Sequence, residues 1–117
     1  KEQELRDFVI ERDGDCRLYD KLTLQEKEEF HRFNPIVMLD RFDVAHIFNK
    51  SSYPWMRYNK QNVVLLSRIF HNRLDTQKHP ITGKTMTKNE TINWWIRIVG
   101  NDVYAQLEDI AKNGRQL

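Results

Sequence analysis

The segment over residues 42–75 constrains the possible fold more than any other part of the chain. An alternation of polar and apolar residues running through Ile47 predicts a strand, and the apolar, β-branched run Val63–Leu66 predicts a second one. A long irregular segment over residues 48–61 separates them, and a helix is expected over residues 67–77. The order strand, long loop, strand, helix predicts an α+β fold with a ββα unit at its centre.

Further helices are expected on both sides of this unit. Apolar residues on one face predict a helix over residues 2–12, and capping boxes predict helices over residues 24–33 and 88–99. A last helix is expected over residues 102–113, with three residues facing inward: Val103, Leu107 and Ile110. A chain of 117 residues without an internal repeat or linker is expected to form one domain, over residues 1–117.

The composition excludes several classes of protein. No apolar run approaches the roughly 20 residues that a membrane span needs, so no membrane partner is expected. The charged residues 1–6 do not resemble a signal peptide. The single cysteine, Cys16, excludes an internal disulfide framework and fits a reducing compartment. These features predict a cytoplasmic protein.

Charge is distributed unevenly along the chain. Residues 1–40 hold 7 Lys/Arg and 11 Asp/Glu, whereas residues 41–97 hold 10 Lys/Arg and 3 Asp/Glu. A basic field over the central segment would attract a polyanion such as nucleic acid. The alternative interpretation is a solvated surface with a chance imbalance of charge.

Several side chains in the central segment could carry out phosphodiester hydrolysis. A neutral histidine such as His46 can take a proton from water near pH 7. His71 and Asp75 are four residues apart on one helical face, where they could bind a divalent metal ion. This mixed nitrogen and oxygen donor set would accept Mg²⁺, Mn²⁺, Ni²⁺ or Zn²⁺. Asn62 could bind a backbone carbonyl and fix the loop that orients His46.

In their order and spacing, these residues resemble the HNH endonuclease family, whose members have a ββα-metal (His-Me finger) core. The matching segments are Asp43–Ile47, Asn62–Leu66, His71–Asp75 and the lead-in Ile10–Cys16. The resemblance implies a metal-dependent endonuclease that hydrolyses DNA, with His46 and Asn62 as catalytic residues and His71 as a metal ligand. It also implies an origin in a phage or mobile element.

The residue directly before the base histidine departs from the family pattern. Most members place an acidic residue or a histidine there as a metal ligand, but this chain has Ala45. Asp75 is expected to supply the missing ligand, as a second helical ligand does in some relatives. Asp43 is the other candidate, although strand alternation puts it on the opposite face from His46.

The zinc-binding cysteines of many family members are also missing. The corresponding pairs are Cys16 with Tyr19 and Ser67 with Phe70, so a structural four-cysteine zinc site is excluded. We expect Tyr19, Phe70 and neighbouring apolar groups to pack where that zinc would lie.

The partner implied by the resemblance is DNA, and a homodimer would suit cleavage of both strands. Basic residues expected to contact phosphates are Lys50, Arg57, Lys60, Arg68 and Arg73. The simpler interpretation of the basic, aromatic loop over residues 49–60 is an ordinary loop anchored in the core by Tyr53 and Trp55. Two other functions stay open: a degenerate nuclease fold that binds nucleic acid without cutting it, and a protein-interaction domain that uses the acidic N-terminal helices.

Overall fold

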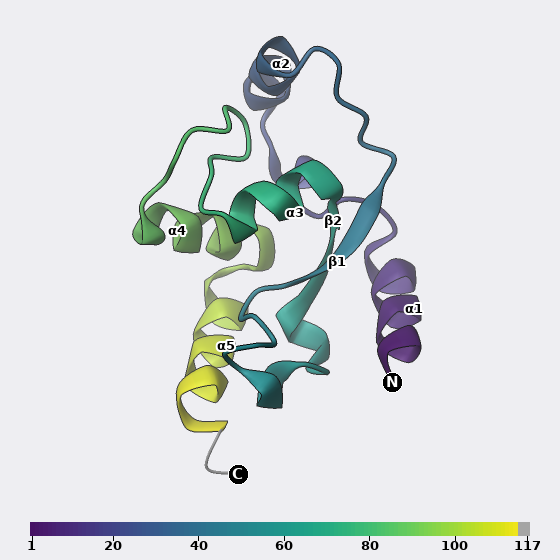
Figure 1. Cartoon of the computed structure of the whole chain (residues 1–117), viewed down its shortest axis with the longest axis vertical. Coiled ribbons are helices and arrows are strands. Elements are labelled where there is room, and N and C mark those ends of the chain that lie inside the picture. Colours follow the sequence, from purple (N-terminus) through teal and green to yellow (C-terminus); the bar gives the residue numbers. More distant parts are fainter. Residues whose placement is uncertain (115–117) are drawn as a thin grey trace.

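The structure is a computed structural model that describes residues 1–114. In this range it has an α+β architecture, with five α-helices and a two-stranded antiparallel sheet (Figure 1). The helices are α1 (Glu2–Asp13), α2 (Leu24–Phe33), α3 (Arg68–Asp75), α4 (Lys88–Val99) and α5 (Asn101–Asn113). Within these residues, no helix combines the length and the apolar character needed to cross a membrane.

The central sheet forms where the sequence predicts it. Strands β1 (Phe42–His46) and β2 (Val63–Ser67) pair antiparallel, with Phe42 opposite Ser67 and His46 opposite Val63. All five residues of β2 are buried, because helices cover both faces of the sheet. Helix α3 begins directly after β2, so the observed order is strand, loop, strand, helix.

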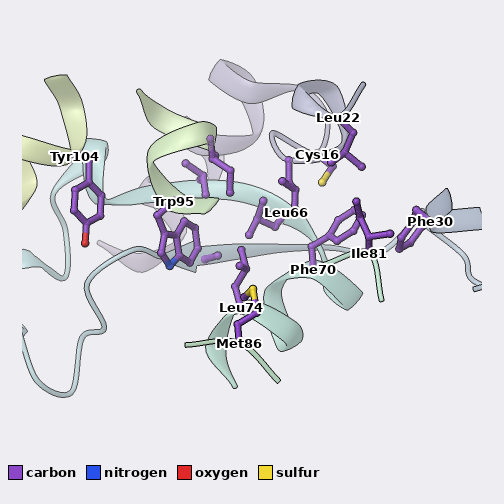
Figure 2. Close-up of a cluster of buried hydrophobic side chains, with 14 residues drawn as sticks. Cys16, Leu22, Phe30, Leu66, Phe70, Leu74, Ile81, Met86, Trp95 and Tyr104 are labelled. Atoms are coloured by element: carbon purple, nitrogen blue, oxygen red, sulfur yellow. The ribbon is translucent and has the colours of Figure 1, made fainter. Parts of the chain in front are cut away.

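The two faces of the sheet pack against different helices. Helix α1 stands alone on one face (Figure 1). Its residues Leu5 and Val9 pack there against Val63 and Leu65. On the other face, a larger cluster joins the sheet to α2, α3 and α4, and its members include Ala45, Leu66, Phe70, Phe30 and Trp95 (Figure 2). The alternation of residues along β2 therefore divides the core into two parts.

Residues at the end of α1 cover the outer edge of β2. The Leu65 amide donates to Asp13 Oδ2 at 2.9 Å, the Arg12 side chain donates to the Val63 carbonyl, and the Arg17 amide donates to the Leu65 carbonyl. Burial raises the pKa of Asp13, but hydrogen bonds from Arg12 and Leu65 outweigh it, so the pKa lies below its usual value. This lead-in segment therefore satisfies backbone groups that a strand edge would expose.

The boundaries of α1, α2, α4 and α5 agree with the sequence analysis to within one residue, whereas α3 is shorter than the expected range 67–77. The inner face of α5 is wider than expected. Both capping boxes form, at Thr23 before α2 and at Thr87 before α4. In α5, Leu107 is buried as predicted, whereas Val103 and Ile110 are only partly buried. Two residues that were not predicted, Tyr104 and Ala111, complete the buried face.

The residues at the positions where the sequence analysis excluded a four-cysteine zinc site lie in or beside the core. Cys16 is buried, and its Sγ accepts a hydrogen bond from the Ser67 amide at 3.2 Å. Phe70 packs against Phe30 with ring centroids 4.9 Å apart (Figure 2). Tyr19 is partly buried and packs against the same cluster. The apolar packing expected for Tyr19 and Phe70 is therefore present.

An ion pair between α2 and α4 makes stability depend on pH. The Arg97 guanidinium donates to Glu26 and lowers the pKa of that carboxyl group to about 2. Because the pKa of Glu26 is depressed in the folded state, the ion pair contributes fully to stability above pH ~4.5. This contribution is lost as the pH falls towards 2. We expect Glu26→Gln, which keeps the capping box, to lower the free energy of unfolding by about 1 kcal/mol at pH 7, because solvent screens part of the ion-pair interaction. In urea unfolding, the difference in free energy between the wild type and Glu26→Gln should shrink below pH ~4.5. A difference that stays constant with pH would mean that the ion pair is not its cause.

Candidate active site

His46 lies at the end of β1, and one of its ring nitrogens is fixed by the backbone. Its Nε2 is 2.9 Å from the carbonyl oxygen of Arg57. A carbonyl only accepts hydrogen bonds, so Nε2 carries the proton and the lone pair of the neutral ring is on Nδ1. Burial lowers the pKa of His46 below its usual value, and the nearby Lys50 lowers it further. His46 is therefore neutral at pH 7, the state that a general base requires.

Asn62 holds the loop that supplies the Arg57 carbonyl. Its side chain is fully buried just before β2. The Phe48 amide donates to Oδ1 at 2.9 Å, and Nδ2 donates to the carbonyls of Phe48 at 2.9 Å and Met56 at 3.2 Å. Because Met56 directly precedes Arg57, these bonds fix both the start and the end of the loop that positions His46.

His71 lies on α3 between two carboxylates. Its Nδ1 is 3.0 Å from Asp43 Oδ2, and its Nε2 is 3.1 Å from Asp75 Oδ2. The hydrogen bond with Asp75 is the main cause that raises the pKa of His71, to about 8, and Asp43 adds to it. Burial opposes this shift but does not cancel it. The ring therefore bridges β1 and the end of its own helix.

A cavity of about 280 Å³ brings together residues from β1 and α3. His46, His71 and Asp75 all line it, together with residues of the following loop and the strand: Val44, Asn49, Lys50 and Ser51. The two histidines, 25 positions apart in the sequence, thus face one shared space. Its wall combines a neutral imidazole, a carboxylate and the ammonium group of Lys50.

Asp43 supports His71 from outside this cavity. Strand alternation places Asp43 with Ala45 on the α3 side of β1, where its carboxylate binds the Arg68 side chain at 3.1 Å and His71 Nδ1. Burial raises the pKa of Asp43, but the hydrogen bonds from Arg68 and His71 outweigh it and the pKa lies below its usual value. As an acceptor for Nδ1–H, Asp43 leaves Nε2 as the nitrogen that a metal ion would use.

The donor atoms of His71 and Asp75 fit a divalent cation. Two neighbouring ligand atoms on an octahedral ion, each about 2.1 Å from it, lie about 3.0 Å apart. The observed separation of His71 Nε2 and Asp75 Oδ2 is 3.1 Å, and both side chains face the cavity. Within residues 1–114, no group of three or more His, Cys, Asp or Glu side chains is arranged to hold a metal ion. With two protein ligands, water or phosphate oxygens would fill the other positions of such an ion.

The basic residues singled out in the sequence have different environments. Lys50 lines the cavity with His46, Arg57 forms an ion pair with Glu2, and Lys60 lies 4.5 Å from the ring centroid of Phe8. Arg68 is paired with Asp43 but half exposed. Arg73 differs from them all, because its guanidinium donates to Asn34 Oδ1 at 2.6 Å and to the Pro80 carbonyl at 2.7 Å.

Helix α1 contributes a second wall beside His46 that the sequence analysis missed. A cavity of about 260 Å³ is lined by His46, Lys50 and Arg57 from the central unit and by Glu2, Gln3, Leu5 and Arg6 from α1, with Val44 and Tyr58. Two cations of the loop and one of α1 therefore lie around the space next to His46. No spacing in the sequence relates residues so far apart.

Arg73 and Lys50 should respond to mutation in opposite ways. We expect Arg73→Met to lower the free energy of unfolding by about 2–3 kcal/mol, because buried carbonyls lose a charged donor, without changing DNA binding. Lys50→Ala should leave stability unchanged and reduce the slope of log affinity against log salt by about 1. Denaturant unfolding measures the stability of both variants, and a salt titration of DNA binding measures their slopes. A reduced slope for Arg73→Met would mean that Arg73 does contact phosphate.

Comparisons of the chain with protein-family models, with curated proteins and with solved structures give no match.

Proposed function

We propose that this protein is a metal-dependent endonuclease that hydrolyses phosphodiester bonds in DNA, built on a ββα-metal core. The observation that supports this most strongly is the shared cavity, in which a neutral histidine fixed through Nε2 faces a histidine–aspartate pair. These are the two components that hydrolysis by an activated water needs: a base near pH 7 and a site for a Lewis acid. The basic central segment supplies the attraction for a polyanion.

In the proposed reaction, His46 Nδ1 takes a proton from water, and the water oxygen attacks phosphorus as the bond to the leaving oxygen breaks. Asn62 and the Arg57 carbonyl hold the ring in position. His71 and Asp75 would hold the divalent cation, with Asp43 orienting His71. When bound, the cation would stabilise the charge on the phosphorane and on the leaving oxygen. Lys50, on the wall of both cavities beside His46, would neutralise a non-bridging phosphate oxygen.

Cleavage of supercoiled plasmid tests this function. The chelator-treated protein should be inactive and should nick or linearise plasmid after addition of Mg²⁺, Mn²⁺, Ni²⁺ or Zn²⁺. Activity restored by none of these ions, with plasmid binding retained, would contradict the endonuclease.

Removal of one proposed ligand should weaken metal binding. We expect His71→Ala and Asp75→Asn each to lower the affinity for Mn²⁺ strongly, and Asp43→Asn to lower it by about 10–100-fold, because Asp43 acts through His71. Calorimetric titration with Mn²⁺ measures these affinities. Asp109→Asn, on the exposed face of α5, is the matched control and should bind as the wild type does. Equal affinities in all four variants would place the metal elsewhere.

A second candidate function is supported by the contacts of His71. Both of its ring nitrogens already have carboxylate partners, so the protonated ring forms a complete bridge between β1 and α3. In a nucleic-acid-binding protein without nuclease activity, this bridge would be purely structural. Such a protein would bind DNA with a steep salt dependence, cut none with any cation, and lose stability rather than metal affinity in His71→Ala.

A further inference from the structure

A third cavity, of about 300 Å³, adjoins the candidate active site. It shares His46 and Asp75 with that site, and its other walls come from the loop after β1, the end of α3, and helices α4 and α5. Whatever fills this space therefore lies next to the proposed base and the proposed metal ligand. The reaction described above does not use it.

The lining of this cavity suits a flat heterocycle. Tyr53 is half-buried and provides the accessible aromatic surface. Trp95 and Tyr104, which are 6% and 8% exposed, reach the cavity from the large core cluster, and Figure 2 shows them towards one end of it. Side chains with hydrogen-bonding groups complete the wall: Asn49, Ser52, Gln77 and Thr91. Aromatic surface with a few polar groups is the usual construction of a small-ligand site, and aromatic side chains stack on bases without regard to their sequence. Lys88, at the start of α4, adds a cation that could meet the adjoining phosphate.

Gln77 is the residue of this cavity with an unusual backbone. Its φ of 54° is the only positive value among the non-glycine residues of 1–114. Its amide donates to the Leu74 carbonyl and its carbonyl accepts from Met86, so the turn after α3 requires this conformation whatever the side chain. Glycine would adopt it at lower cost. A strained residue whose side chain lines a cavity beside the reacting groups points to a role for that side chain.

We propose that this cavity binds an unpaired nucleobase of the strand that is cut, with the base against the aromatic surface and the Gln77 amide bonded to its edge. The inference rests on the proposed function and narrows its substrate. The preferred DNA would carry an unpaired nucleotide beside the cleaved bond, as in a single strand or a flap. A fully paired duplex would have to open to fill the cavity.

Binding measured in chelator tests the cavity without cleavage. The probes are a fluorescein-labelled 16-nucleotide strand of mixed sequence and its duplex, followed by anisotropy. The wild type should bind the single strand about 10-fold more tightly than the duplex, because stacking of one unpaired base adds to the affinity for the single strand. Gln77→Gly should raise the melting temperature by relieving strain and yet weaken single-strand binding by about 3–10-fold, with duplex binding unchanged. Gln106→Ala, on the exposed face of α5, is the matched control and should change neither.

A second variant separates the cavity from the backbone effect. Ser52 is exposed at the rim, so Ser52→Trp should fill the space without disturbing the core and should give the same selective loss. Equal single-strand and duplex affinity in the wild type, or unchanged single-strand binding in both variants, would overturn the proposal. If single-strand binding is selective and depends on Gln77 but no metal ion supports cleavage, the cavity proposal stands and only the proposed endonuclease activity is overturned.

Discussion

Replacement of His46 by alanine should abolish plasmid cleavage while leaving DNA binding intact. Nδ1 of this ring holds the lone pair, because Nε2 donates to the Arg57 carbonyl, and burial keeps the ring neutral at pH 7. General-base catalysis contributes about 10²–10⁴-fold to a rate, so the loss should be of that size. DNA binding should persist because the basic residues that attract the polyanion remain. Single-turnover cleavage and a filter-binding titration on the same samples measure the two effects.

Two further variants separate base catalysis from positioning. His46→Gln can still donate to the Arg57 carbonyl but offers no basic nitrogen, so it should be as inactive as His46→Ala and more stable. His31→Ala, on the exposed surface of α2, should cleave at the wild-type rate. Substantial cleavage by His46→Gln would show that the ring positions the loop and is not the base.

Replacement of Asn62 by alanine should affect stability and activity together. The substitution removes the side-chain partner of the Phe48 amide and of the Phe48 carbonyl, and it leaves the Met56 carbonyl with the Asn59 amide alone. Loss of these bonds should cost about 2–4 kcal/mol in the free energy of unfolding, since each unsatisfied buried group costs about 1–3 kcal/mol and the loop can relax. The rate of cleavage should also fall at temperatures where the variant is fully folded, because the Arg57 carbonyl then no longer fixes His46.

Asn59 offers a matched comparison three residues earlier. Its side chain accepts a hydrogen bond from the Gln61 amide in the same loop, but it makes none of the contacts around Phe48 and Met56. Asn59→Ala should cost about 1 kcal/mol or less and should keep the wild-type rate. Equal losses of rate in Asn59→Ala and Asn62→Ala would mean that any disturbance of the loop inactivates the protein, and that Asn62 has no particular positioning role.

The elements that could be predicted from the sequence are those with local signals. Capping boxes at Thr23 and Thr87 mark the starts of α2 and α4 because the bonds that form them lie within four residues. The run of apolar residues Val63–Leu66 marks β2 because a strand buried on both faces is apolar at nearly every position. The spacing of His71 and Asp75 placed them in contact for the same local reason.

Features that depend on long-range packing were beyond the sequence. Arg73 was expected to contact phosphate, and only the return of the chain past Pro80 and Asn34 shows that its guanidinium is used inside the fold. The position of Asp43 on the far side of His71 from the cavity depends on where α3 crosses β1. The contact between Arg57 and Glu2, 55 residues apart, likewise arises from the docking of α1 against the sheet.

The position of the metal ion tests the central claim most directly. Crystals of His46→Ala soaked in Mn²⁺ and bound to a short DNA would show the ion by its anomalous scattering. We expect one peak in the shared cavity, bound by His71 Nε2 and Asp75, with a phosphate oxygen among its other ligands. The contrary result would be no peak in this cavity at Mn²⁺ concentrations that support cleavage by the wild type, with His71 still paired to both carboxylates. That result would contradict the account.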